Sequence, residues 1–289
     1  MLGVVLMVVA ATLNATASVL QRHATKDEPE SAGFSLHLLT DLLRRPVWLL
    51  GIATMLAGFV LHGVAIALSH ISLVQPLLVV ELPCTLLLAS WYFGVRIPAR
   101  DWAAIAAQTA GLAAFVACLR PTGGDPHRLP AAAWALAVTV TSLVIGLLVV
   151  LGYRGRREHR AAMLGIATGA TFGLNSSLIA GVGAAVGHGG GLFTTWQTYG
   201  VAVLGPLSFY LLQNALQAGN LVASQPGFTL VNPLVSVLWG WLVFGEQPRG
   251  GAYLVGTALG GVLVAVGTAV LARSSLLDPS TSEHRPAEG

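Results

Sequence analysis

Apolar residues dominate the chain in runs of about 20, separated by short polar segments. Each run is long enough for a helix to cross the hydrocarbon core of a bilayer. The runs do not alternate apolar and polar residues, which disfavours membrane barrel strands. Helices are the expected spanning element, because lipid cannot satisfy bare backbone groups. We therefore predict nine transmembrane helices, over residues 2–20, 47–68, 71–93, 101–119, 131–151, 161–186, 195–217, 220–244 and 251–272.

The composition fits a membrane protein, since 55% of the residues are hydrophobic and only 9% are charged. Soluble domains carry about 25% charged residues. The two cysteines, Cys84 and Cys118, both fall in apolar runs, so neither a disulfide framework nor a cysteine metal site is expected. Zinc spacings, phosphate-binding loops and dinucleotide fingerprints are missing from the sequence. We expect neither enzyme activity nor a cofactor.

The basic residues indicate how the chain lies in the membrane. With the N-terminus outside, three Lys and Arg residues fall on outer segments and twelve on inner ones. No basic residue precedes the first apolar run, which indicates an uncleaved helix and not a signal peptide. We therefore expect an outer N-terminus, a cytoplasmic C-terminus, and lipid and a solute or ion as partners. Nucleic acid is not expected, and whether the protein forms a homodimer stays open.

Two segments fall outside the predicted spans. Residues 31–46 are too short and too charged to cross, and their leucines recur at helical spacing, which predicts an interfacial helix. The polar tail over 273–289 is expected to be disordered and cytoplasmic. Arginine, alanine and glycine greatly outnumber the single lysine, as in proteins from GC-rich bacteria, so the expected location is a bacterial cytoplasmic membrane.

Three motifs occur twice in the same order. The pairs are Leu13-Asn14 with Leu174-Asn175, Gln75-Pro76 and Pro83 with Gln225-Pro226 and Pro233, and Phe93-Gly94 with Phe244-Gly245. They match helices 1–4 to helices 6–9 and leave helix 5 as a linker. An offset of five helices inverts one half relative to the other, as in many secondary transporters. We predict an all-α integral membrane fold with repeats over 1–120 and 161–272, joined through 121–160.

Several of these stretches carry a family resemblance. They are TASVLQRHA after the first helix, LTDLLRRPVWLLGIATMLAGFVLHGVAIALSHISLVQPL, and LVASQPGFTLVNPLVSVLWGWLVFGEQ. The chain resembles the drug/metabolite transporter (DMT) superfamily and its EamA-type permeases, and is most similar to the NIPA-like magnesium-transporter branch. The Gly-Glu at Gly245 matches the end of an EamA helix, while the first half has Gly94-Val95. Small multidrug resistance proteins use a glutamate where this chain has Asn14, which cannot carry a proton.

The predicted eighth helix has one polar stripe, formed by Gln225, Thr229, Asn232 and Ser236 at helical spacing. Its prolines, Pro226 and Pro233, match Pro76 and Pro83 in the third helix. Broken helices at membrane depth are tolerated where they line a cavity, so the prolines are candidate hinges and the stripe a candidate pathway. Hydrogen bonds between helices are the alternative.

Glu81 is the acidic residue placed inside a predicted span, where an unpaired carboxylate costs several kcal/mol. It is a candidate proton or cation site, or else a hydrogen-bonded structural residue. Gln75 beside it, and the matched Asn14 and Asn175, are further pathway candidates. His62 could titrate or bind a cation, or simply pack. Glu81 and His62 are weak metal candidates, and the metal is unknown.

The seventh helix gathers amides and a phenol on one narrow face, at Tyr210, Gln213 and Asn214. This face suits a polar, zwitterionic or cationic ligand, or else holds helices together. Asp101 and Glu246 follow loops at the starts of helices, where an acidic side chain favours the helix dipole. These two are expected to be structural.

The function that the sequence favours is secondary transport of a small polar metabolite, drug or cation by alternating access. A NIPA-type transporter of magnesium or another divalent cation is the alternative within transport. A membrane enzyme or a non-transport interaction protein is the alternative from another class.

Overall fold

The computed structural model describes residues 2–25, 45–94, 96–154, 157–217 and 221–272. Its helices are α1 (Leu2–Thr25), α3 (Pro46–Ala67), α4 (Ile71–Val74), the 3₁₀ helix η1 (Gln75–Val80), α5 (Glu81–Phe93), α6 (Ala99–Leu119), the 3₁₀ turn η2 (Pro126–Arg128), α7 (Ala131–Arg154), α8 (Arg157–Gly187), α9 (Trp196–Gln217), α10 (Leu221–Leu238), the π-helical η3 (Trp239–Val243) and α11 (Ala252–Leu271). The strands β1 (Thr122–Gly123) and β2 (Glu246–Gln247) pair antiparallel. The predicted interfacial helix and C-terminal tail fall outside the described residues, apart from residues 45 and 46 of the former.

The all-α part of the prediction is confirmed, whereas the count of nine spans is not. Among the described residues, seven helical stretches are long and apolar enough to cross a membrane. They are Leu2–Gln21, Pro46–Ala67, Ile71–Tyr92, Ala99–Leu119, Ala131–Arg154, Arg160–Gly187 and Ala252–Leu271. The apolar part of α10 and η3 is shorter, at Thr229–Val243. Large apolar side chains such as Leu143 and Leu147 of α7 are exposed on the outside of the bundle, which suits lipid and not water.

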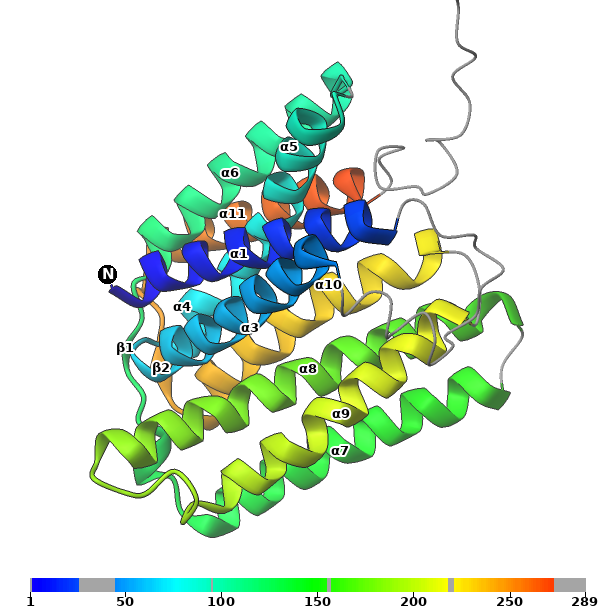
Figure 1. Ribbon diagram of the computed structural model, residues 1–289. Coiled ribbons are helices and arrows are strands. Elements are labelled where there is room, and N and C mark those ends of the chain that lie inside the picture. Colours follow the sequence, from blue (N-terminus) through cyan, green and yellow to red (C-terminus); the bar gives the residue numbers. More distant parts are fainter. Residues whose placement is uncertain (1, 26–44, 95, 155–156, 218–220, 273–289) are drawn as a thin grey trace, which may run out of the picture.

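The helices run side by side as one bundle (Figure 1). At one edge α6 packs on α11, and at the opposite edge α8 packs on α7 and α9. Between these edges α1 packs on α3, while α10 contacts α4, η1 and α8. The bundle therefore encloses the short segments α4 and η1 with α10 at its centre.

Small residues set the closest approaches between helices. A Cβ atom at Gly260 of α11 would lie 2.7 Å from the carbonyl oxygen of Gly111 on α6. A Cβ atom at Gly173 of α8 would lie 2.7 Å from the Cβ of Val235 on α10. Contacts this short are possible only for glycine, and this packing is typical of membrane helices.

The predicted break in the third span is present. The chain changes from α-helix to 3₁₀ helix at Gln75, with Pro76 in the first turn of η1, and becomes α-helical again at Glu81. Pro83 lies in the first turn of α5, where proline is tolerated. Proline has no N–H to bond the Val79 carbonyl, and Gln108 of α6 donates its amide to that oxygen at 2.6 Å. A neighbouring helix thus satisfies the carbonyl that the break exposes.

The matching break in the second half was predicted wrongly. α10 continues as an α-helix through Pro226 and Pro233, and the irregular segment is η3, which starts at Trp239. Repetition of the proline motif does not repeat the backbone. The two proline motifs differ in their position within the helices. Gln75 and Pro76 follow directly on the four-residue helix α4, whereas Pro233 lies inside the longer helix α10.

The strands lie at one end of the bundle, which we call the strand end. It comprises the α3–α4 turn, residues 120–130, the α8–α9 loop and residues 244–251. Thr122 pairs with Gln247 and Gly123 with Glu246, so the loop after α6 is bonded to the loop after η3. This pairing joins the ends of two helices that are far apart in sequence.

Candidate functional site

Five elements form a closed ring at the centre of the bundle. α1 contacts α3, α3 contacts α8, α8 contacts α10, α10 contacts η1, and η1 contacts α1. Each of the five carries a polar side chain that is buried or partly buried. We call these side chains, together with Glu81 at the start of α5, the central polar group. Its members are Asn14, His62, Ser72, Gln75, Glu81, Asn175, Asn232 and Ser236, with Ser72 and Ser236 one turn from Gln75 and Asn232.

Helix contacts place Asn14 and Asn232 beside the middle of a neighbouring helix. Asn14 in the middle of α1 lies against Gly58 in the middle of α3, where a Cβ atom would collide with the Asn14 Oδ1. On the other side of the ring, a Cβ atom at Gly173 would lie 3.0 Å from the carbonyl oxygen of Asn232. Gly173 is two residues from Asn175, in the middle of α8. Both sides of the ring therefore present amides near mid-depth.

Glu81 and Asn14 form a pair between α5 and α1. The Asn14 side chain lies within hydrogen-bonding reach of the Glu81 side chain. Gly58 leaves the space for the amide, so three elements build this site. The sequence singled out Asn14 and Glu81 as separate candidates, and the structure brings them together.

His62 and Gln75 form the second pair, between α3 and η1. The Gln75 amide nitrogen lies 3.3 Å from the His62 Nε2, and because the amide can only donate, the ring nitrogen accepts. Gln75 is fully buried. This bond occupies one of the two ring nitrogens with which His62 could bind a cation. Within the described part of the chain, no group of three or more His, Cys, Asp or Glu side chains is placed to hold a metal ion.

Unsatisfied oxygen atoms distinguish this region from the rest of the molecule. The described residues contain eight buried side-chain nitrogen or oxygen atoms without a protein hydrogen-bond partner, and five of them belong to the central polar group. The five are Ser72 Oγ, Gln75 Oε1, Asn175 Oδ1, Asn232 Oδ1 and Ser236 Oγ. Each buried polar atom left unpaired costs about 1–3 kcal/mol. Native proteins keep few such atoms, so these oxygens are suited to a donor from outside the protein.

The oxygens continue along one interface, between α4–η1 and α10–η3. A Cβ atom at Gly240 would lie 3.1 Å from the Cβ of Ser72, so these two residues face each other. Ser236 is one helical turn from Gly240, and Asn232 one turn further. Gln75 follows Ser72 by one turn on the other wall. Polar oxygens therefore extend from near the strand end to mid-depth.

The predicted site on α9 lies elsewhere. Tyr210 is 63% exposed and Gln213 is exposed, on the outside of the bundle. Asn214 accepts a hydrogen bond from the Tyr153 hydroxyl at 3.1 Å and donates to the Tyr210 carbonyl at 2.7 Å. These contacts join α9 to α7, so the structure separates this face from the central polar group.

The remaining predicted residues lie on α10. Thr229 is partly buried, one turn before Asn232, and is not among the unpaired residues. The side chains of residues 221–228, including Gln225 and Pro226, fall outside the described part of the chain. Of the predicted polar stripe on α10, the structure therefore describes the side chains from Thr229 onward.

Glu246 contacts the start of a different helix from the one predicted. It does not begin its own helix but lies in β2, 5% exposed. Its carboxylate accepts hydrogen bonds from the backbone N–H groups of Ile71 at 2.9 Å and Ser72 at 3.1 Å. A carboxylate at a helix N-terminus satisfies free N–H groups and favours the dipole. Glu246 thus fixes the start of α4, which leads directly into the central polar group. Asp101 does begin its helix, as predicted, in the first turn of α6.

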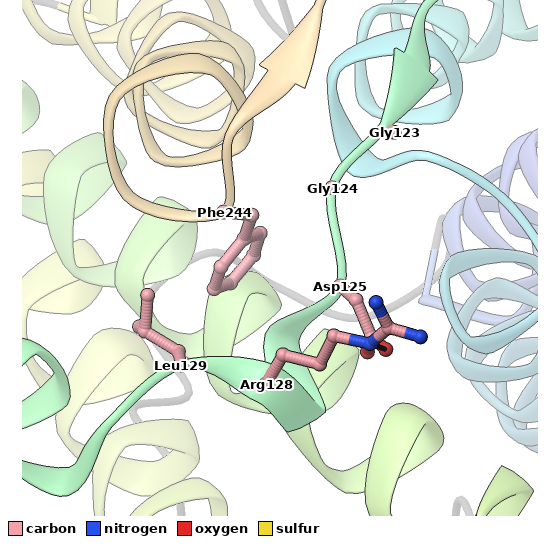
Figure 2. A pocket seen from close by; sticks show the side chains of 6 residues that line it. All are labelled: Gly123, Gly124, Asp125, Arg128, Leu129 and Phe244. Carbon is pink, nitrogen blue, oxygen red and sulfur yellow. Dashed lines mark ion pairs between the residues drawn. The ribbon is translucent and has the colours of Figure 1, made fainter.

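Two cavities open at the strand end. One of about 510 Å³ is lined by Gly123, Gly124, Asp125, Arg128, Leu129 and Phe244. Figure 2 shows Phe244 and Leu129 on one side of it and Arg128 reaching toward Asp125 on the other. The second, of about 340 Å³, extends from the α3–α4 turn to the end of α8 and includes Glu246. This cavity borders Ile71 at the start of α4, the residue before Ser72.

The fold and the enclosed polar residues define a multi-pass α-helical membrane protein. No family model matches the chain, and no solved structure matches it. The chain is 28% identical over 251 residues to an uncharacterized protein of Corynebacterium glutamicum. That alignment covers 86% of each protein, so the similarity extends over most of both chains.

Proposed function

We propose that the protein is a secondary transporter that moves a small polar metabolite, drug or cation across the membrane by alternating access. The observation that carries this proposal is the set of five buried oxygen atoms without a protein partner, on elements of the ring to which α1 and Asn14 also belong. Buried polar atoms are normally paired with protein groups or with ordered water, so oxygens without a protein partner are free to bond water or a solute. A transporter needs such atoms to replace the water around its solute.

The proposed architecture is the nine-helix, inverted-repeat arrangement of the DMT superfamily, close to the EamA and NIPA-like proteins. Contacts within the halves support it, since α1 packs on α3 and α5 as α8 packs on α9 and α10. The ends of the matched spans also agree, because Gly94 and Gly245 both have positive φ, at 66° and 74°. We place the strand end outside a bacterial cytoplasmic membrane and the C-terminus in the cytoplasm.

In this mechanism the solute binds within the ring, between α1, α3 and η1 on one side and α8 and α10 on the other. Glu81 supplies a carboxyl group, and the amide and hydroxyl oxygens accept hydrogen bonds from the solute. The 3₁₀ segment between Pro76 and Glu81 has weaker backbone hydrogen bonds than an α-helix. It is therefore the candidate hinge, and movement there changes which end of the ring is open.

Solute uptake by liposomes that contain the purified protein tests this proposal. We expect flux of at least one solute in a panel of polar metabolites, cationic drugs and divalent cations. Glu81→Gln should reduce that flux roughly 10- to 100-fold, because hydrogen bonds to charged groups contribute about 1.5–3 kcal/mol. Gln213→Ala, on the exposed face of α9, is the control and should transport normally. If folded protein moves none of the panel, the proposal is wrong.

Transport of magnesium or another divalent cation is the second candidate. It is favoured by the lining of the central polar group, where every unpaired atom is an oxygen. Magnesium prefers oxygen ligands and keeps several of its waters. Glu81 is the one carboxylate in this group, so the ion would pass largely hydrated. Magnesium flux that is unchanged by Glu81→Gln would remove this carboxylate from the mechanism.

A further inference from the structure

Residues 120–130, which we call the strap, bond to every loop of the strand end. The Leu119 carbonyl just before the strap accepts from the Arg249 N–H at 3.0 Å, and β1 pairs with β2. His70 of the α3–α4 turn donates its Nε2–H to the Gly123 carbonyl at 2.9 Å. The Trp134 indole of α7 donates to the Pro126 carbonyl at 3.2 Å. The strap thus ties together the ends of helices from both halves.

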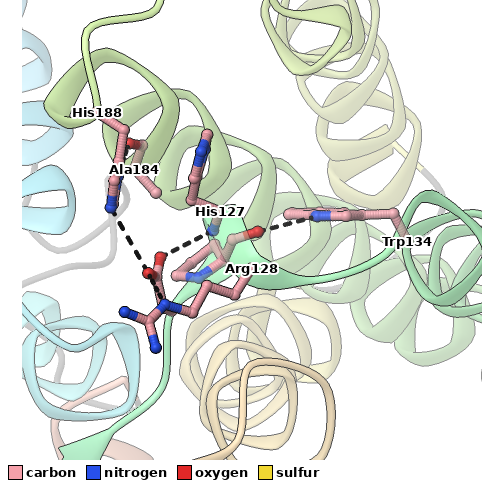
Figure 3. A network of polar contacts seen from close by, with 7 residues as sticks. His127, Arg128, Trp134, Ala184 and His188 are labelled. Carbon is pink, nitrogen blue, oxygen red and sulfur yellow. Dashed lines mark hydrogen bonds and ion pairs between the residues drawn. The ribbon is translucent and has the colours of Figure 1, made fainter.

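Asp125 is the centre of these contacts. One carboxylate oxygen accepts from the His127 N–H at 2.9 Å. The other lies 3.3 Å from Arg128 Nε and 3.7 Å from His188 Nε2 (Figure 3). The His188 ring stacks on the His127 ring at 4.2 Å and donates its Nδ1–H to the Ala184 carbonyl at 2.8 Å. The Asp125–His188 contact and the His127–His188 ring stack together join the strap to the end of α8.

The cavity beneath the strap does not offer a free cation site. Its two carboxylates, Asp125 and Glu246, both accept hydrogen bonds from protein groups. These donors take up part of the hydrogen-bonding capacity of both carboxylates, and the described residues hold no group of three or more His, Cys, Asp or Glu side chains placed to bind a metal ion. The acidic residues here therefore serve as a joint between loops.

The joint bears directly on the central polar group. Gly124 has a positive φ of 75°, and a Cβ atom there would lie 2.6 Å from the Glu246 Cγ. The strap therefore packs closely on Glu246, which in turn holds the N–H groups of Ile71 and Ser72. Ser72 is fully buried and carries the unpaired oxygen nearest to the strand end. The strap, the Glu246 carboxylate and the start of α4 are therefore in contact one after the other, between the strand end and Ser72.

We propose that the strap is the gate of the strand end, and that Asp125 is its latch. While Asp125 holds His188, the strap covers the start of α4 and closes the path to Ser72. Release of Asp125 lets the strap and Glu246 move together and opens that end. That the gate controls passage of a solute rests on the proposed transport function. Its opening can be measured without any solute.

The test is the reaction of a cysteine at position 72 with a membrane-impermeant thiol reagent. Ser72→Cys is placed in a chain that also carries Cys84→Ser and Cys118→Ala, in right-side-out and inside-out vesicles. Asp125→Ala should speed labelling about fivefold from the strand end, since it removes the pairs with both Arg128 and His188. Arg128→Gln is the matched control. Arg128 is well exposed, so its loss should change the rate less than about twofold.

An unchanged labelling rate from both sides in Asp125→Ala would overturn the latch. Hydrogen–deuterium exchange of the 66–80 segment, with Asp125→Ala as the one substitution, gives a second measurement that does not need the cysteine. It should show faster exchange at Ile71 and Ser72. Faster labelling in a protein that moves no solute would support the gate and contradict the transport proposal. Solute flux with unchanged labelling and exchange would support the transport proposal and contradict the gate.

Discussion

Polar side chains gather in two regions of this protein, and their hydrogen bonds set the regions apart. At the strand end, Asp125, His188 and Glu246 are all bonded to protein groups. In the central polar group, five buried oxygen atoms have no protein partner. Paired polar groups hold a structure together, whereas unpaired ones are suited to binding a solute. Loss of a paired group at the strand end should therefore change stability and gating, and loss of an unpaired group at the centre should change transport with little effect on stability.

The largest expected effect on stability is at Gly58, where structure and site meet. A Cβ atom there collides with the Asn14 Oδ1, so Gly58→Ala should destabilise the protein by about 1–3 kcal/mol. Gly63→Ala on the same helix is the control, because its Cβ would meet only Ile179 Cγ2, at 3.9 Å. Thermal unfolding in detergent would show a lower Tm for the first variant alone. Equal Tm values would mean that Asn14 does not depend on Gly58.

Glu246→Gln should have the next largest effect. The amide has one acceptor oxygen where the carboxylate has two, so one of the N–H groups of Ile71 and Ser72 loses its partner. We expect a loss of about 1–2 kcal/mol, as for other helix caps and charged hydrogen bonds. The neighbouring Gln247→Ala, at an exposed position, is the control in the same unfolding measurement. A Glu246→Gln protein as stable as wild type would argue against the cap.

Ser236→Ala should have the smallest effect on stability. Its hydroxyl has no protein partner, so removal should be neutral or stabilise by up to about 1 kcal/mol. Ser208→Ala is the matched control, because the buried Ser208 hydroxyl does bond, to the Leu204 carbonyl at 2.7 Å. Solute flux should fall in the first variant and persist in the second. Greater destabilisation by Ser236→Ala than by Ser208→Ala would contradict the comparison.

Much of the fold was predictable, because a run of about 20 apolar residues has few alternatives to a helix in lipid. The break in the third span followed from Gln75-Pro76 and Pro83. The two prolines of α10 did not predict that this helix is continuous. Whether a carbonyl freed by proline is satisfied depends on the side chains that pack near it. Gln108 is such a neighbour for Val79, and it is 29 positions away in sequence.

The candidate site was predictable as a set of residues but not as pairs. Asn14 and Glu81 stand out in sequence because polar residues are costly in hydrocarbon. Their partnership depends on how α1 packs against α5, and on the space left by Gly58. The amides of α9 stand out for the same reason, yet Tyr210 faces outward. Polarity marks a residue for attention, but the neighbouring helices decide whether it faces the core or the lipid.

A single pair of variants tests most directly whether the central polar group is the path. Gln75→Ala and Gln213→Ala make the same change, once at a fully buried ring position and once on the exposed face of α9. Both are compared with wild type by solute uptake into liposomes, at matched amounts of folded protein. We predict that Gln75→Ala lowers flux at least about tenfold, the loss expected for one hydrogen bond to a charged solute, and that Gln213→Ala leaves it within about twofold. Normal flux in Gln75→Ala with lost flux in Gln213→Ala would contradict the account and move the path to α9.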